Sequence, residues 1–221
     1  MKAYYTNQWL RNQMEEALWK YICALPQWGN TDHVPEMPKV FKSRVKKLLN
    51  IDRASGAEKN NWVFFESAGE GTGTQESYSD FHVFMMGIAL YMLNIGFKQS
   101  EIIFFLQHTQ QDIKKRYNQI RSSGDVAPIW GANRSEIENA VSHFMLINRV
   151  EMQETVPALS GDNPIIMCPV FVKGLEGLKK ELHTYPNLYT AFTAIELADI
   201  ALTLPALLSA IPAAGRGRPA A

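Results

Sequence analysis

The spacing of apolar residues predicts that most of the chain is helical. Between Asn7 and Leu25, apolar side chains recur at steps of three and four residues, which is the spacing of one helix face, and Pro26 ends the pattern. A second amphipathic pattern runs from Val40 to Leu49 and carries its basic residues largely off the apolar face. Further helices are predicted at residues 81–94, 101–106 and 109–121, and later near 135–149, 172–183 and 189–204.

Several polar residues and one glycine indicate where these helices begin and end. Ser77 or Ser79 can act as N-cap of the helix at 81–94, and Gly96 is suited to a left-handed C-cap. Thr109 and Asp112 have the T-x-x-D spacing of a capping box. This spacing predicts that a new helix begins at Thr109.

One segment has the composition of a β-strand rather than a helix. Residues 62–66, WVFFE, are rich in residues with β propensity, and the segment that follows contains three glycines before Tyr78. A strand, a flexible glycine tip and a return strand predict a hairpin. The expected fold class is therefore mainly α, with a winged helix-turn-helix-like region, a small β-hairpin and a helical C-terminal region.

Composition shifts along the chain predict four parts. Residues 1–38 form an N-terminal helix and a proline-containing linker, and residues 39–124 form the winged-helix region. Residues 125–213 are expected to form a helical region for self-association or partner contact, with an irregular stretch at 155–169. Residues 214–221 are a basic tail that cannot pack a core and is expected to be disordered without DNA.

Charge changes this picture only through its distribution. The 221 residues carry 22 basic and 22 acidic side chains, so the whole chain has no net attraction to a polyanion. Residues 39–59, however, have a net charge of +5, whereas residues 122–214 have a net charge of −5. This asymmetry indicates a polyanion partner for the middle of the chain.

The sequence lacks the features of an exported or membrane-spanning protein. The first residues have no apolar core of signal-peptide length, and charged residues and Pro205 interrupt the most apolar late stretch. Cys23 and Cys168 lie far apart without a CxxC pattern, so no disulfide framework is expected. We expect a cytoplasmic protein without membrane contact.

No combination of residues predicts catalysis. The glycines at 69, 71 and 73 are not followed by GK[ST], and Ser160 is not in a GxSxG elbow. The five histidines are dispersed without HExxH or another metal-ligand spacing. We therefore expect no catalytic residues, no metal and no cofactor.

The order of elements in residues 39–120 resembles MerR-type winged-helix DNA-binding domains. FKSRVKKLLNIDR is similar to their recognition helix and its exit, WVFFE with Tyr78 and Ser79 to the wing and the start of the next helix, and NIGFKQSEIIFFL to their glycine-centred helix pair. The resemblance implies that one helix enters the major groove of duplex DNA while the wing contacts the backbone.

Two segments compete for the role of recognition helix. One is 39–50; the other is 109–121, which with QSEIIFFLQ before it could form a separate helix-turn-helix. The candidate DNA-binding residues of the first segment and its exit are Lys42, Arg44, Lys46, Lys47 and Arg53. Those of the second segment are Lys114, Lys115 and Arg116.

The C-terminal tail adds two candidate residues. Gly215 to Pro219, GRGRP, resembles the AT-hook core, in which an extended Arg-Gly-Arg lies in the narrow minor groove of A·T-rich DNA. This resemblance implies minor-groove contacts for Arg216 and Arg218.

Together these observations predict a DNA-binding transcriptional regulator of bacterial or phage type. It is expected to bind double-stranded DNA and to form a homodimer. The alternative is a helical protein-interaction adaptor or anti-regulator that does not bind DNA and whose acidic C-terminal half binds a protein partner.

Overall fold

A computed structural model describes residues 8–24, 34–59, 61–66, 76–129, 141–148, 169–184 and 192–213. The chain is mainly helical and has small antiparallel sheets. It divides into two units, the first comprising residues up to Gln110 together with those from Ile200 onward, and the second comprising Gln111–Asp199. These bounds differ from the four ranges expected from the sequence.

Helix α3 (Asp80–Asn94) lies at the centre of the first unit. Every residue from Asp80 to Leu90 is buried, because the helix is apolar on nearly all sides. Ser79 caps its first turn by accepting a hydrogen bond from the backbone N–H of His82, at 3.3 Å. Gly96 follows its last turn with a φ of 93°. The helix and both predicted caps are confirmed.

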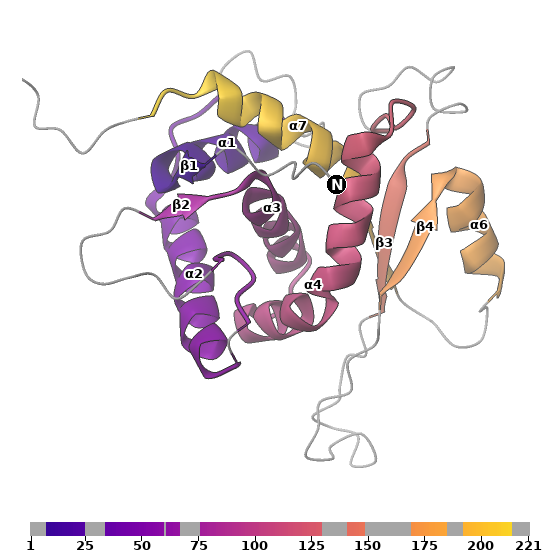
Figure 1. Ribbon diagram of the computed structural model, residues 1–221, viewed down its shortest axis with the longest axis horizontal. Coiled ribbons are helices and arrows are strands. Elements are labelled where there is room, and N and C mark those ends of the chain that lie inside the picture. Colours follow the sequence, from indigo (N-terminus) through magenta and orange to yellow (C-terminus); the bar gives the residue numbers. More distant parts are fainter. Residues whose placement is uncertain are drawn as a thin grey trace, which may run out of the picture. The chain divides into compact units, whose positions relative to one another are not determined.

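Helices α1 (Arg11–Cys23), α2 (Lys39–Lys59) and α7 (Leu197–Ala210) surround α3 in the first unit (Figure 1). Gly87 of α3 allows α7 to approach closely, since a Cβ atom there would lie 2.8 Å from Ile200. The Gln13 side chain links the start of α1 to the end of α7 by donating to the Ile211 carbonyl at 2.8 Å. The first two predicted helices are thus confirmed, and α2 extends ten residues beyond the predicted end at Leu49.

The predicted hairpin of residues 62–66 with Tyr78 is wrong. Strand β2 (Ser77–Tyr78) pairs antiparallel with β1 (Trp9–Leu10), and residues 62–66 are not a strand. The Asp52 carboxylate of α2 accepts hydrogen bonds from the N–H groups of Val63 and Phe64, each at 2.9 Å. These amides are therefore satisfied without a strand partner. The predicted glycine tip, residues 69–73, lies outside the described residues.

The two helices predicted at 101–106 and 109–121 are one helix, α4 (Gln99–Ser122). Thr109 lies inside this helix and does not begin a new one. Its hydroxyl donates a hydrogen bond to the Phe105 carbonyl one turn earlier, at 2.8 Å, instead of capping a helix. The separate helix-turn-helix expected across this segment is therefore absent from α4.

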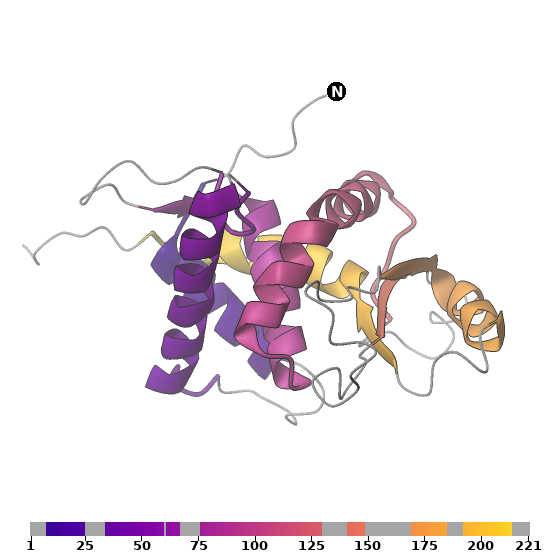
Figure 2. The same cartoon turned by 90° about the horizontal axis from the view of Figure 1, so that it is seen from below.

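The second unit contains a three-stranded antiparallel sheet in the order β4-β3-β5. Its strands are β3 (His143–Asn148), β4 (Val170–Lys173) and β5 (Phe192–Glu196). Helix α6 (Gly174–Thr184) packs against β4 and β3, and Figure 2 shows it beside the sheet. The helix predicted near 172–183 is thus confirmed as α6.

The helices predicted at 135–149 and 189–204 are wrong over residues 143–148 and 192–196, which are strands. Residues 143–147 are all buried. In a short run that is buried on both faces, the spacing of apolar residues does not distinguish a central strand from a buried helix. Residues 135–140, and residues 155–168 of the expected irregular stretch, lie outside the described residues.

Candidate nucleic-acid interface

Helix α2 has one buried face and one basic face. Phe41, Val45, Leu48 and Leu49 are at most 7% exposed, and the Pro38 carbonyl accepts the N–H of Phe41 at the first turn. The helix lies at the edge of its unit in both views (Figures 1 and 2). Among the described residues, one side of α2 is therefore buried and the cations of its other side are exposed.

Five cationic side chains on the first half of α2 are exposed. They are Lys39, Lys42, Arg44, Lys46 and Lys47. None of the five forms an ion pair with an acidic group in the part of the chain that the structure describes. Within the described ranges, no acidic side chain therefore neutralises their charges.

Other helices show a different arrangement. Lys20 pairs with Glu16 at 2.7 Å, and Lys115 pairs with Asp112 at 3.1 Å, each within one helical turn. On α2, by contrast, residues 39–51 contain no acidic residue, and the first one, Asp52, is buried. The positive charge of α2 is a property of its sequence, and the fold leaves it facing solvent.

Spacing places three of these lysines in one row. Lys39, Lys42 and Lys46 are three and four residues apart and share one face, while Lys47 lies beside that row. From Lys39 to Lys46 the helix rises about 10 Å, which is close to the axial rise of about three base pairs of DNA. We call Lys39, Lys42, Lys46 and Lys47 the α2 lysine row.

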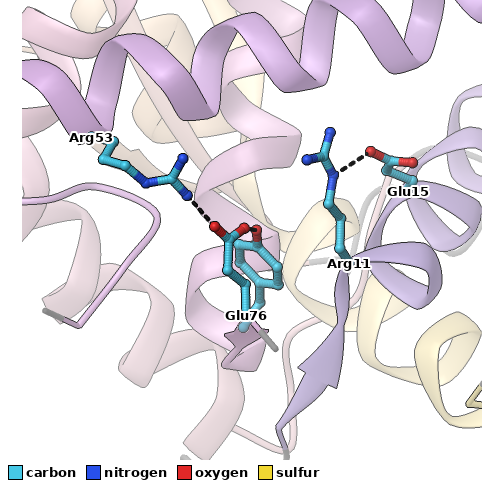
Figure 3. A network of polar contacts seen from close by, with 5 residues as sticks. Arg11, Glu15, Arg53 and Glu76 are labelled. Carbon is cyan, nitrogen blue, oxygen red and sulfur yellow. Dashed lines mark hydrogen bonds and ion pairs between the residues drawn. The ribbon is translucent and has the colours of Figure 1, made fainter. Parts of the chain in front are cut away.

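Arg53 continues this face but is occupied by contacts within the protein. Its guanidinium forms an ion pair with Glu76 (Figure 3). The same guanidinium lies 4.9 Å from the centre of the Phe65 ring. The other carboxylate oxygen of Glu76 accepts the hydroxyl of buried Tyr78 at 2.7 Å. Arg53 therefore links α2 to the β2 region. Unlike the lysines of the α2 lysine row, it has an acidic partner among the described residues.

Arg44 lies off the row, on the flank of α2 that borders an apolar pocket of the first unit. The sequence grouped it with Lys42, Lys46 and Lys47 because all four are basic residues of one short helix. Arg44 is three residues before Lys47 and therefore next to it on the helix surface, on the side of Lys47 away from Lys42.

The competing candidates on α4 have partners. Arg116 donates to Gln119 at 3.0 Å and lies 5.5 Å from the centre of the Phe171 ring, and Lys115 has its ion pair with Asp112. Lys114 is half-buried. All three belong to the second unit. Among the described residues, α2 has five exposed cations without an acidic partner, whereas Lys114 and Arg116 of α4 are half-buried and Lys115 is paired with Asp112.

Near Arg116, the pKa of His143 lies below its ordinary value, chiefly because the ring is buried and also because Lys173 and Arg116 are close. The lowered pKa favours the neutral imidazole, which adds no positive charge beside Arg116 and Lys173.

The tail candidates Arg216 and Arg218 lie outside the described residues. Within the described ranges, no three His, Cys, Asp or Glu side chains are grouped closely enough to hold a metal ion. No helix among these residues is long and apolar enough to cross a membrane.

Sequence reasoning missed the pocket beside Arg44 altogether. Its polar groups include Tyr21 and Tyr91, whose hydroxyls are 3.2 Å apart although the residues are 70 positions apart in sequence. No local pattern could reveal that pairing, because it depends on how α1 and α3 pack.

Comparisons of the chain with protein-family models, with curated proteins and with solved structures find no match.

Proposed function

We propose that this protein binds double-stranded DNA through the α2 lysine row, as a DNA-binding transcriptional regulator. One observation carries the proposal: α2 presents exposed cations that have no acidic partner among the described residues, in a chain whose formal charge is zero. The proposal rests on this surface and does not depend on the resemblance to MerR-type domains.

Duplex DNA is the polyanion that fits this surface best. The row Lys39, Lys42 and Lys46 covers about 10 Å of the first half of α2, which suits a phosphate backbone with regularly repeating charge. Contacts of this kind fix the position of a protein on DNA without reading bases. The homodimer expected from the sequence would place two such rows on one duplex, and it remains a prediction.

Three Lys-Lys pairs in the chain allow a matched test. They are residues 46–47 on α2, 114–115 on α4 and 179–180 on α6. Replacing each pair by Ala removes the same two charges from a helix. Binding of the wild type and the three variants to a fluorescent mixed-sequence duplex is measured by anisotropy at low salt, after circular dichroism has shown that each variant is folded.

We expect Lys46→Ala/Lys47→Ala to weaken binding about tenfold, the order expected when exposed charge contacts to two phosphates are lost. The variant at 179–180 should bind within about twofold of the wild type, because these two lysines are outside the α2 lysine row and their loss only lowers the net charge, a screened effect. A loss confined to the 114–115 variant would transfer the interface to α4. Equal losses in all three variants, or no binding by the wild type, would contradict the proposal.

A further inference from the structure

An apolar pocket opens in the first unit, lined by residues of α1, α3 and the start of α2. Leu18, Phe41 and Leu90 contribute to its wall and are each at most 7% exposed. Val40 also lines the pocket and is 58% exposed, which places it at the mouth. The pocket is therefore open to solvent on the side of α2 and apolar within.

The size of the pocket restricts what it can hold. Its volume is about 200 Å³. An apolar cavity of about 150 Å³ is enough to hold a benzene molecule. The space thus suits one aromatic ring with a short chain, or an aliphatic chain of similar volume.

Polar side chains accompany the apolar wall, and Asn94 is one of them. Arg44 lines the pocket, is exposed, and has no ion pair among the described residues. The paired hydroxyls of Tyr21 and Tyr91 form a further polar spot in the lining. A guanidinium beside an apolar space matches the planar, bidentate geometry of a carboxylate.

We propose that this pocket binds a small apolar carboxylate, with the ring or chain inside it and the carboxylate on Arg44. Charge complementarity selects this occupant: a neutral apolar molecule would leave the cation without a partner, and an amine would be repelled by it. This inference is independent of DNA binding, because it concerns the flank of α2 and can be measured without nucleic acid.

The test uses 3-phenylpropionate and its neutral analogue 3-phenylpropionamide, titrated separately into the full chain by isothermal calorimetry. The carboxylate should bind about fivefold more tightly than the amide, the effect of one partly exposed charge pair. Arg44→Gln should remove this preference while both probes still bind weakly. Arg121→Gln, the same change at an exposed site on α4, should keep the preference.

A second variant tests the pocket itself. Val40→Trp places a large ring at the mouth from an exposed position, so it should abolish binding of both probes while the melting temperature stays unchanged. Equal affinity for the carboxylate and the amide, or an unchanged preference in Arg44→Gln, would overturn the role of Arg44. Absence of binding by either probe at its solubility limit would overturn the pocket as a ligand site.

Discussion

A few polar side chains of α2 and α4 determine the conformation of residues 61–65. The Asp52 carboxylate is fully buried and accepts the backbone N–H groups of Val63 and Phe64. Burial raises the pKa of this carboxyl, and the two N–H groups oppose that shift. Asn61 and Gln107 exchange side-chain to carbonyl hydrogen bonds at 3.2 and 3.1 Å, which fastens the same segment to α4.

The Trp62 ring lies against Gly56 of α2, which leads to a prediction about glycine. A Cβ atom at position 56 would overlap this ring, whereas a Cβ at Gly177 of α6 would be 3.7 Å from its nearest neighbour, Val172. Gly56→Ala should destabilise the protein by about 1–3 kcal/mol through overpacking. Gly177→Ala should instead stabilise it by up to about 1 kcal/mol, since alanine is the better helix former.

Urea unfolding of the two glycine variants measures both effects against the wild type. The opposite signs are the informative result. A gain in unfolding free energy for Gly56→Ala would show that the Trp62 ring does not occupy the space beside α2.

At the scale of elements, the short β1–β2 pair is joined to α2 through one buried tyrosine. Tyr78 is fully buried, and its hydroxyl donates to Glu76, which in turn is paired with Arg53. Burial is the main reason that the pKa of Tyr78 lies far above its ordinary value, and the Glu76 carboxylate adds to the shift.

This raised pKa predicts how Tyr78 responds to alkali. The folded state holds the phenol neutral, so its contribution to stability is complete below the ordinary tyrosine pKa of about 10 and is lost as the pH rises above it. Tyr78 should therefore ionise only when the protein unfolds. Tyrosinate absorbance, followed together with circular dichroism, should show this group in the unfolding step.

Tyr78→Phe provides the reference for that titration. The variant should lack the absorbance of one tyrosine in the unfolding step and match the wild type in the earlier steps. If the missing absorbance falls in an earlier step, Tyr78 is accessible to hydroxide in the folded protein, contrary to its burial.

Local patterns in the sequence predicted the helices better than the strands. The apolar periodicity of α1, the cap at Ser79 and Gly96 depend on neighbours in sequence, and all three were predictable. Residues 62–66 have β propensity, but Asp52, more than ten positions earlier, accepts the N–H groups of Val63 and Phe64. Strand β3 is flanked by two other strands, a context that its own six residues do not contain.

The candidate interface was predictable in part. The basic composition of residues 39–47 is visible in the sequence, and so is the absence of acidic residues between positions 39 and 51. The pairing of Arg53 with Glu76 and the place of Arg44 at the pocket are not visible, because each depends on residues brought together by packing.

At the scale of the whole molecule, the zero net charge conceals an uneven distribution, and the tail contributes two of the cations. If residues 214–221 act as an AT-hook, their removal should weaken binding by about 1 kcal/mol on duplexes with A·T-rich flanks. The loss should be smaller on G·C-rich flanks, where the guanine amino group obstructs the minor groove. Anisotropy titrations on the two duplexes measure the difference, and equal losses would reduce the tail to general phosphate attraction.

The salt dependence of DNA binding tests the central claim most directly, because its slope counts the phosphates that the protein neutralises. The logarithm of the affinity should fall linearly with the logarithm of the salt concentration, and Lys46→Ala/Lys47→Ala should reduce the slope by about 1.8, or about 0.9 for each lost contact. The variant at 179–180 should keep the slope of the wild type. An unchanged slope for a folded variant at 46–47 would show that the α2 lysine row does not contact phosphates.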